Sequence, residues 1–463
     1  HQCQQHCARN DYEGPVQIRE MKKLAVENGF ADFRKEWEGA TEKSDVKAAV
    51  VGAGPAGLAA AYFLSRAGFD THVYENEQDA GGVVRYVIPS FRIPASVIQQ
   101  DIDFIKAHGV TFHFGAKTEE ETVGALKQAG YSYLFYAVGA ESSRPLGIDG
   151  ENVRSAWDFL AGFHTDPKGI SLGKHVLVIG GGNTAMDAAR AAKRVPGVED
   201  VTIVYRRSIE EMPANKEELD LALAEGVKTS FLTNPVSLAD DVATLAVMTL
   251  GEPDASGRRS PKDTGKRISL PCTAMLTALG EKADGGLLSA FGLPLTDKGW
   301  PEADRETKKT PLEGVYAIGD MQGGPSVVVK CIASAQAAVD DAIDDVLGDE
   351  ADDEEHMHHH CDDEDCHCHD HEHDDDEEEE LSPEEQDQLT RDEDAYFADL
   401  YEKKTHIREG LKSGEKEFAV REGKRCMECS YLCNKCVDVC PNRANVAVDV
   451  RSLGMFDNPF QIV

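Results

Sequence analysis

The chain has 463 residues, a length that accommodates several domains, and 41% of its residues are hydrophobic. It carries 84 acidic residues against 48 Lys and Arg, which gives a formal net charge of −36. This charge makes nucleic acid and anionic membrane surfaces poor partners. No apolar run reaches the ~18 residues of a membrane-spanning helix, so we expect no membrane insertion. We see no signal peptide, and the thiol-rich composition favours the reducing cytoplasm.

The most informative pattern near the start is VKAAVVGAGPAGLAAAYFLSRAGFDTHVYEN. Gly52, Gly54 and Gly57 stand at G-x-G-x-x-G spacing between an apolar run and a helix predicted over 55–66. In such a unit the helix N-terminus faces a pyrophosphate, and the glycines allow the turn, the approach of the ligand and close helix packing. Glu75 ends the next strand, where a carboxylate accepts hydrogen bonds from ribose hydroxyls.

A second unit begins about 128 residues later with KHVLVIGGGNTAMDAARAAKRVPGVEDVTIVYRRS. Gly180, Gly182 and Ala185 stand at G-x-G-x-x-A spacing, and the following strand ends in Arg206 and Arg207 rather than in an acid. Arginines suit a 2′-phosphate through charge-assisted bonds, which favours NADPH over NADH. The alternative is that both arginines are solvated surface charges.

A third element, GVYAIGD at 314–320, is followed by a helix predicted to begin near Pro325. Asp320 is placed to bond a flavin ribitol, with the helix N-terminus facing the cofactor. Two nucleotides in one chain indicate a flavoprotein that passes hydride between a nicotinamide and a flavin. For this chemistry we expect no catalytic acid, base or nucleophile.

The order of motifs resembles the NADPH-dependent flavoprotein subunit of glutamate synthase and its relatives, which include the N-terminal half of dihydropyrimidine dehydrogenase. The resemblance covers about residues 1–345 and rests on GAGPAG, YVIPSFRIP, YAVGA, GGGNTAMD, YRRS, TALG, AIGD and, most specifically, the run at 211–227. The cysteine-rich tail is similar to the long iron–sulfur subunits named for selenate reductase. The resemblance implies FAD on the first unit, NADPH on the second, and iron–sulfur clusters on both sides.

The predicted cofactor-binding residues come from these motifs. They are Gly52, Gly54, Pro55, Ala56, Gly57, Glu75, Gly82, Arg85, Gly139, Gly180, Gly182, Asn183, Thr184, Ala185, Arg206, Arg207, Gly280, Gly319, Asp320, Ser326 and Val327.

Five cysteines lie within fifteen residues of the tail, with proline after the last: Cys426, Cys429, Cys433, Cys436 and Cys440. Thiolates at this density bind zinc or an iron–sulfur cluster. The final C-x3-C-P favours a [4Fe-4S] cluster, although the spacing between the second and third cysteines departs from the ferredoxin pattern. Five candidates for four ligands leave the ligand set open.

Cys3 and Cys7 open the chain. In the resembled family a cysteine pair at this point supplies the last ligands of an N-terminal cluster. Since two cysteines do not complete such a cluster, we expect its other ligands on sequence upstream of His1. The alternative is a pair of free thiols. Cys272 and Cys331 lie singly in apolar runs and are expected to be small core residues.

Residues 349–380 hold 19 acidic residues, eight histidines, three cysteines and no Lys or Arg. Such a segment repels itself and is expected to be a disordered linker. Its imidazoles and thiols suit a divalent metal such as zinc or nickel, and a solvating spacer is the alternative.

The expected fold class is α/β, with two nested Rossmann-like domains and short helical cysteine-rich segments at both ends. The expected domains are an iron–sulfur remnant (1–44), an FAD domain (45–160 with 280–348), an inserted NADPH domain (161–279), the acidic linker (349–390) and a C-terminal iron–sulfur segment (391–463).

The expected partner is an electron-acceptor domain or subunit, such as a molybdenum enzyme. A disulfide reductase resembling thioredoxin reductase is disfavoured, because no C-x-x-C or C-x4-C occurs between residues 8 and 360. A metal-binding or assembly scaffold built on a flavoprotein relic is the alternative from a different class.

Overall fold

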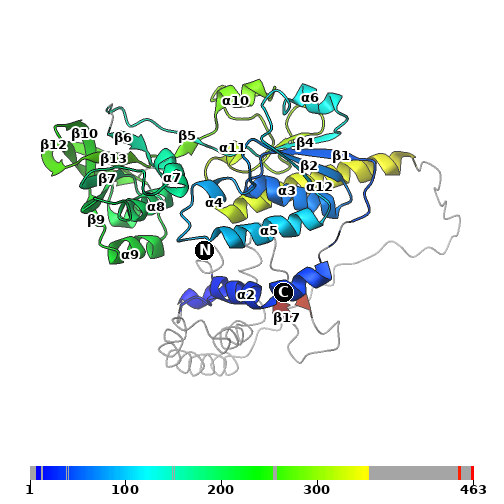
Figure 1. The fold of residues 1–463 in the computed structure, drawn as a ribbon, viewed down its shortest axis with the longest axis horizontal. Helices are drawn as coiled ribbons and strands as arrows, with labels where there is room; N and C mark the ends of the chain where they lie inside the picture. Colours follow the sequence, from blue (N-terminus) through cyan, green and yellow to red (C-terminus); the bar gives the residue numbers. More distant parts are fainter. Residues whose placement is uncertain are drawn as a thin grey trace, which may run out of the picture. The chain divides into compact units, whose positions relative to one another are not determined.

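The computed structural model describes residues 7–11, 14–37, 39, 41–148, 150, 152–253, 258–353, 447–449 and 460–462. Cys3, the acidic segment beyond Asp353 and the five tail cysteines lie outside these residues, so the predictions made for them are not addressed by the fold. The chain divides into one unit of residues 1–38 with 344–463 and a second unit of residues 39–343. The second unit contains all the glycine motifs (Figure 1).

The first sheet of this unit is parallel, in the order β15-β4-β1-β2-β3. Its strands are β1 (Lys47–Val51), β2 (Asp70–Glu75), β3 (Thr111–Phe114), β4 (Tyr133–Tyr136) and β15 (Val315–Ala317). Four of the five residues of β1 are buried and β4 is buried throughout, as expected of central strands with both faces covered. The chain between the strands forms α3 (Pro55–Arg66), α4 (Val83–Tyr86), α5 (Ala95–Ala107), α6 (Val123–Gln128) and α10 (Gly285–Ala290), and α11 (Asp320–Gly323) follows β15.

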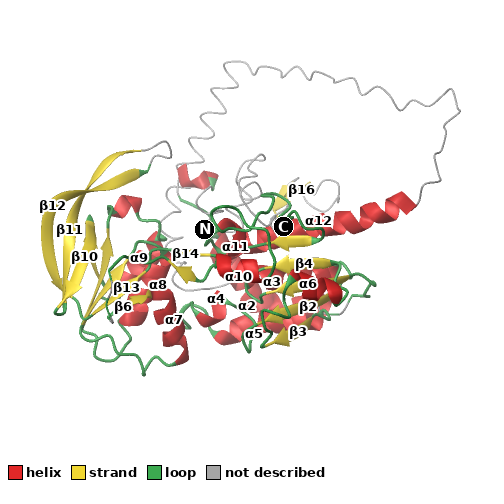
Figure 2. Ribbon diagram, turned by 90° about the horizontal axis from the view of Figure 1, so that it is seen from above, coloured by secondary structure: helices red, strands yellow, loops and turns green. Residues whose placement is uncertain are grey.

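The second sheet is also parallel, in the order β6-β13-β7-β8-β9. Its strands are β6 (Val153–Ser155), β7 (His175–Ile179), β8 (Asp200–Tyr205), β9 (Lys228–Phe231) and β13 (Ala274–Thr277), and its helical segments are α7 (Ala156–Thr165), α8 (Asn183–Ala192), η2 (Ile209–Glu211) and α9 (Lys216–Ala224). An antiparallel sheet adjoins it, made of β10 (Thr233–Ala239), β11 (Val242–Pro253) and β12 (Arg259–Pro271) (Figure 2). Two parallel sheets with helices confirm the predicted α/β class.

The two crossings between the sheets are made by β5 (Ser142–Ser143) and β14 (Glu281–Lys282), which pair with each other. The first crossing follows the YAVGA motif at 136–140, and the second follows TALG at 277–280. β6 pairs with β13, and Phe159 and Leu160 of α7 pack into the second core. A three-residue strand carries too weak a local pattern to be assigned to either sheet from sequence.

The other unit contains η1 (Ala8–Asp11), α2 (Ile18–Trp37) and the paired strands β16 (Ala447–Asp449) and β17 (Phe460–Ile462).

The long helix α12 (Val328–Asp353) begins in the unit of residues 39–343, three residues after Pro325. It continues into the acidic segment that we expected to be disordered from residue 349. Helix propagation adds one hydrogen bond per residue, so a helix already formed extends past the end of its apolar face. In the described part of the chain, no helix is both long and apolar enough to cross a membrane.

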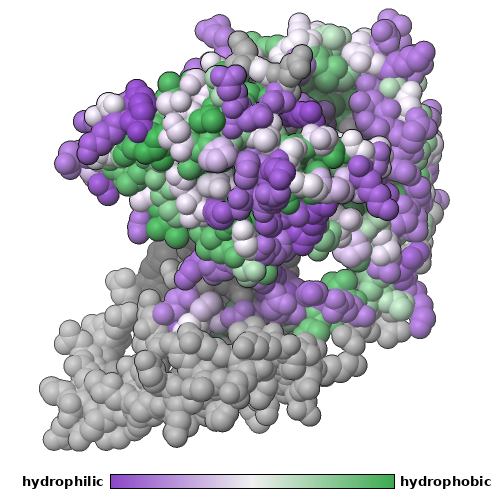
Figure 3. All heavy atoms as spheres, turned by 60° about the vertical axis from the view of Figure 1, so that its left-hand side comes forward, coloured by the Kyte–Doolittle hydropathy of each residue, from purple (hydrophilic) through white to green (hydrophobic). Residues whose placement is uncertain are grey.

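The surface of the second unit mixes residue types. On the face drawn in Figure 3, hydrophilic side chains predominate and hydrophobic ones are interspersed among them. Leu221 and Leu223 are among the large hydrophobic residues that are partly exposed. Single exposed apolar residues of this kind are ordinary on a protein surface.

Candidate nucleotide-binding sites

The first glycine turn connects β1 to α3. Gly52 has φ +96°, and its N–H donates to the Tyr74 carbonyl at 2.8 Å. A Cβ on Gly52 would lie 2.7 Å from the Ala137 carbonyl oxygen, and one on Gly57 would lie 1.9 Å from the Gly52 oxygen. The chain itself therefore requires glycine at both positions, with or without a ligand.

Three turns converge at the N-terminus of α3. The Gly81 N–H donates to the Ala53 carbonyl at 2.8 Å, and a Cβ on Gly82 would lie 2.8 Å from the Gly54 Cα. A Cβ on Gly319 would lie 2.7 Å from the Ala56 Cβ. A side chain at Gly82 or Gly319 would clash with the chain itself, so glycine at these positions lets the three turns meet in a cradle. The N-terminus of α3 opens at this cradle, and a helix N-terminus with its first backbone N–H groups free of intrahelical partners is where a pyrophosphate binds.

Glu75 is 6% exposed, and its carboxylate is tied to the backbone. Oε2 accepts the Ala53 N–H at 2.7 Å, and Oε1 accepts the Glu77 N–H at 3.0 Å. Glu75 therefore braces the first glycine turn, a role that the sequence pattern did not predict. A carboxylate accepts about four hydrogen bonds, so two acceptor positions are left for ribose hydroxyls.

Other acids lie around Glu75. Burial, followed by the charges of Glu75 and Glu120, raises the pKa of Glu121 to about 7. Burial and the charge of Glu75 also raise the pKa of Glu141. The surroundings of Glu75 therefore disfavour further negative charge.

Asp320 begins α11 and has one carboxylate oxygen engaged. Its Oδ1 accepts the Ser326 hydroxyl at 2.7 Å and the Cys331 thiol at 3.3 Å. Burial raises the pKa of Cys331 to about 12, which keeps the thiol protonated as a donor. Cys331 is buried, as expected, but its bond to Asp320 was missed because no local pattern links positions eleven residues apart.

The remaining predicted residues of the first site differ in their surroundings. Arg85 donates through Nε to the Ala80 carbonyl at 2.5 Å and through Nη2 to Gln99 at 2.8 Å, which pins the turn before Gly81. Val327 is 47% exposed. Gly139 and Gly280 have φ of +74° and +93°, and a Cβ on either would meet nothing within 4 Å.

The second glycine turn connects β7 to α8. Gly180 has φ +148°, and a Cβ there would lie 2.3 Å from the Ala278 carbonyl oxygen. Ala185 is fully buried against the second core. Gly182 differs from both, because a Cβ added there would meet nothing within 4 Å. The middle glycine thus borders open space at a helix N-terminus, which fits a pyrophosphate.

The loop before α9 is anchored to this turn. Asn183 accepts the Asn215 N–H through Oδ1 at 2.9 Å, and the Gly181 carbonyl accepts the Ala214 N–H at 2.9 Å. Thr184 lies half-buried in the first turn of α8. These bonds give a structural reason for part of the run at 211–227, which no general nucleotide motif requires.

The two arginines after β8 are not equivalent. Arg206 is exposed, whereas Arg207 is 7% exposed and donates through Nε to the Arg259 carbonyl at 2.8 Å. The Arg207 carbonyl in turn accepts the Leu232 N–H at 3.1 Å. Arg207 therefore ties the strand end to its neighbours, and Arg206 is the arginine with its side chain at the surface.

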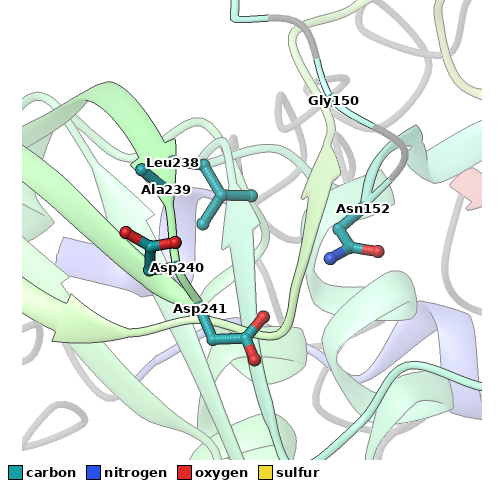
Figure 4. Close-up of a pocket in the computed structure, with 6 residues that line it drawn as sticks. All are labelled: Gly150, Asn152, Leu238, Ala239, Asp240 and Asp241. Atoms are coloured by element: carbon teal, nitrogen blue, oxygen red, sulfur yellow. The ribbon is translucent and has the colours of Figure 1, made fainter.

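A cavity of about 230 Å³ lies elsewhere in the second unit, lined by Gly150, Asn152, Leu238, Ala239, Asp240 and Asp241 (Figure 4). The Asn152 carbonyl accepts the Met275 N–H and the Asp241 carbonyl accepts the Cys272 N–H, which places the cavity near the start of β13. The Gly180 turn follows the carboxyl end of the neighbouring strand β7. The cavity is therefore not the nucleotide site.

A family model described as pyridine nucleotide-disulphide oxidoreductase matches residues 46–342. The chain belongs to this family. The match covers both sheets and both glycine turns, and it makes the chain an oxidoreductase.

Curated relatives confirm the resemblance to glutamate synthase small chains. The Glutamate synthase [NADPH] small chain of Halomonas elongata is 32% identical over 74% of this chain and 77% of its own length. The Escherichia coli protein YgfK is 42% identical over 100% of this chain but only 41% of its own length. The NADPH-Fe(3+) oxidoreductase subunit beta of Geobacter sulfurreducens is 35% identical over 73% of this chain and 55% of its own length. The chain thus spans about half or less of these last two relatives.

Solved structures support the fold alone. FprA from Mycobacterium tuberculosis matches with a TM-score of 0.58 and 24% identity, over 67% of this chain and 87% of its own. Thioredoxin reductase from Lactococcus lactis matches with a TM-score of 0.50 and 18% identity, over 66% of this chain and 100% of its own.

Proposed function

We propose that the chain is the entry stage of an electron-transfer oxidoreductase, in which electrons pass from NADPH by way of FAD to [4Fe-4S] clusters and then to an acceptor on further sequence or a partner subunit. The observation that carries this proposal is the pair of glycine turns within one unit. Each turn follows the carboxyl end of a parallel strand and opens a helix, which is where dinucleotides bind in α/β folds.

FAD is assigned to the first turn and NADPH to the second. The first turn has the three-turn cradle and the Glu75 carboxylate, and Oδ2 of Asp320 accepts no hydrogen bond from the described residues. The second turn has the open position at Gly182 and the exposed Arg206, which supplies positive charge for a 2′-phosphate. When both are bound, the nicotinamide would supply the hydride and the flavin would accept it, and the chain would bind and align the two rings.

The names of the relatives support NADPH and a multisubunit setting. One is named a small chain of glutamate synthase [NADPH], and another is named subunit beta of an NADP(+)-dependent formate dehydrogenase. We accordingly propose that the acceptor lies on a partner, with a molybdenum enzyme as one candidate. Cys272 and Cys331 form no disulfide with any described residue, which suits the reducing cytoplasm as the compartment.

The clusters are proposed from the cysteines at 426–440 and from Cys3 and Cys7. The chemistry of the donor set fits a cubane, which takes thiolate ligands. Zinc is the competing occupant. Iron and acid-labile sulfide analysis of anaerobically purified protein separates the two: zinc without iron would refute the cluster assignment and leave the flavin assignment intact.

The nucleotide assignment is tested by releasing the bound cofactor and identifying it, then titrating the protein anaerobically with NADPH. We expect FAD at one per chain and bleaching of the flavin band by NADPH. A colourless protein that binds only zinc or nickel would instead favour the metal-binding scaffold.

A further inference from the structure

Two sequence motifs without a role in nucleotide binding meet in the second unit. Arg92 lies in the loop VIPSFRIP between α4 and α5, and Glu218 lies on α9 in the run at 211–227. Arg92 Nη1 donates to both carboxylate oxygens of Asp187, at 2.9 and 2.7 Å, and its Nη2 donates to Glu218 Oε1 at 2.6 Å. We call Arg92, Asp187 and Glu218 the Arg92 bridge.

The bridge is well shielded from water and charge-balanced by its neighbours. The side chains of Arg92, Asp187 and Glu218 are 25%, 6% and 14% exposed. Arg190 contacts Glu218 at 3.4 Å and Glu225 at 2.8 Å. Burial raises the pKa of Asp187 to about 6, against the opposing effect of the Arg92 charge and its hydrogen bonds.

Phe91 adds an aromatic contact beside the bridge. Its ring lies under the guanidinium groups of Arg190 and Arg194, at 4.9 and 4.2 Å from the ring centroid. Both distances are within the range of a cation–π interaction. Phe91 and Tyr86 also pack against the core of the second sheet.

The bridge connects the two glycine turns through short stretches of chain. On one side, Gly82 packs closely against Gly54 of the first turn and immediately precedes α4, which leads into the loop that carries Arg92. On the other side, Asp187 lies on α8, five residues after Gly182 of the second turn. The bridge is therefore a direct contact between the segments that follow the two turns.

We propose that Arg92 is a positioning residue, whose paired contacts with Asp187 and Glu218 hold the second glycine turn in register with the first. The inference rests on the proposed hydride transfer between the two nucleotides. A buried ion pair contributes little net stability compared with apolar packing. In some proteins such a pair instead specifies one arrangement of the groups around it, which is the role we propose for Arg92. Hydride transfer needs such fixed geometry, because misplacement by about 1 Å costs about 100-fold in rate.

The test uses the flavin-loaded chain and the Arg92→Met variant, with Arg267→Met as the matched control. Arg267 is exposed and pairs with Asp263 within β12, so its loss leaves both turns untouched. Two quantities are measured: the anaerobic rate constant of flavin reduction at saturating NADPH, and amide hydrogen exchange in α8 and α9 without added NADPH.

For Arg92→Met we expect the reduction rate to fall by about tenfold or more while the Kd of NADPH changes by less than about threefold. We expect exchange in α8 and α9 to rise by about fivefold, since loss of the bridge favours local opening. Arg92→Lys should recover part of both effects because it retains one ion pair. Arg267→Met should match the wild type in both measurements.

If Arg92→Met reduces its flavin at the wild-type rate and shows wild-type amide hydrogen exchange in α8 and α9, the positioning role is wrong. A fall in rate that is matched by loss of NADPH affinity would also overturn it, because the effect would then lie in binding. If Arg92→Met does not fold, Asp187→Asn and Glu218→Gln replace it with the same expected outcomes. Failure of NADPH to reduce the wild-type flavin would instead refute the proposed function.

Discussion

Replacing Gly182 by alanine separates cofactor binding from folding. A Cβ at this position would meet nothing within 4 Å, and the backbone, at φ −92° and ψ 176°, is open to any residue. Alanine is a poorer N-cap than glycine, but it also restricts the unfolded chain, and the two effects are each below about 1 kcal/mol and opposite in sign. The free energy of unfolding is therefore expected to change by less than about 1 kcal/mol.

The same Cβ would occupy the space that we assign to the pyrophosphate of NADPH. Losing one hydrogen bond to a charged phosphate costs about 1.5–3 kcal/mol, which corresponds to a Kd weaker by roughly 10- to 150-fold. The assays are thermal unfolding without nucleotide and fluorescence titration with NADPH.

Gly180→Ala is the matched contrast. Its Cβ would lie 2.3 Å from the Ala278 carbonyl at φ +148°, so this variant should lose stability before any ligand is added. Wild-type NADPH affinity in Gly182→Ala, or a loss of stability as large as that of Gly180→Ala, would refute the reasoning.

The remaining predictions concern charge. Arg206→Ala should weaken the binding of NADPH by about 1.5–3 kcal/mol and leave the binding of NADH unchanged, since only NADPH carries the 2′-phosphate. Equal losses of affinity for both nucleotides would contradict the assignment. Arg207→Ala should instead act on folding. We expect the free energy of unfolding, measured by urea denaturation, to fall by about 1–3 kcal/mol, because the Arg259 carbonyl loses its hydrogen bond from Arg207. Glu121→Gln tests the pH dependence of stability. Burial, followed by the charge of Glu75, raises the pKa of Glu121 from 4.5 to about 7. Between these two values the folded state holds a proton that the unfolded state releases, so the free energy of unfolding of the wild type falls as the pH rises from 4.5 to 7. Above pH 7 the glutamine variant should be more stable by up to ~3 kcal/mol, with no difference below pH 4.5, and parallel stability curves would contradict this.

Local patterns predicted the parts of the fold that depend on neighbouring residues. The helix expected over 55–66 is α3 (Pro55–Arg66), because a glycine turn, a proline in the first helical turn and an apolar face all lie within a few residues of one another. Glu75 was expected at the end of β2 and lies there, since alternating burial defines that strand.

The contacts that were missed join residues far apart in the chain. Arg92 and Glu218 are 126 residues apart, and Arg207 and Arg259 are 52 apart. Nothing in the local sequence distinguishes an arginine that donates to a distant carbonyl from an exposed arginine that is available to bind a phosphate. The sequence therefore predicted the same phosphate-binding role for both arginines at the end of β8, whereas in the structure Arg206 is exposed and Arg207 is buried.

The central claim is that one chain holds NADPH and a flavin in contact. The most direct measurement is an anaerobic titration of the purified, flavin-loaded protein with NADPH and, separately, with NADH, followed by the visible flavin band. We predict complete bleaching by NADPH at a rate far above that with NADH. A flavin band that NADPH leaves unchanged would contradict the account.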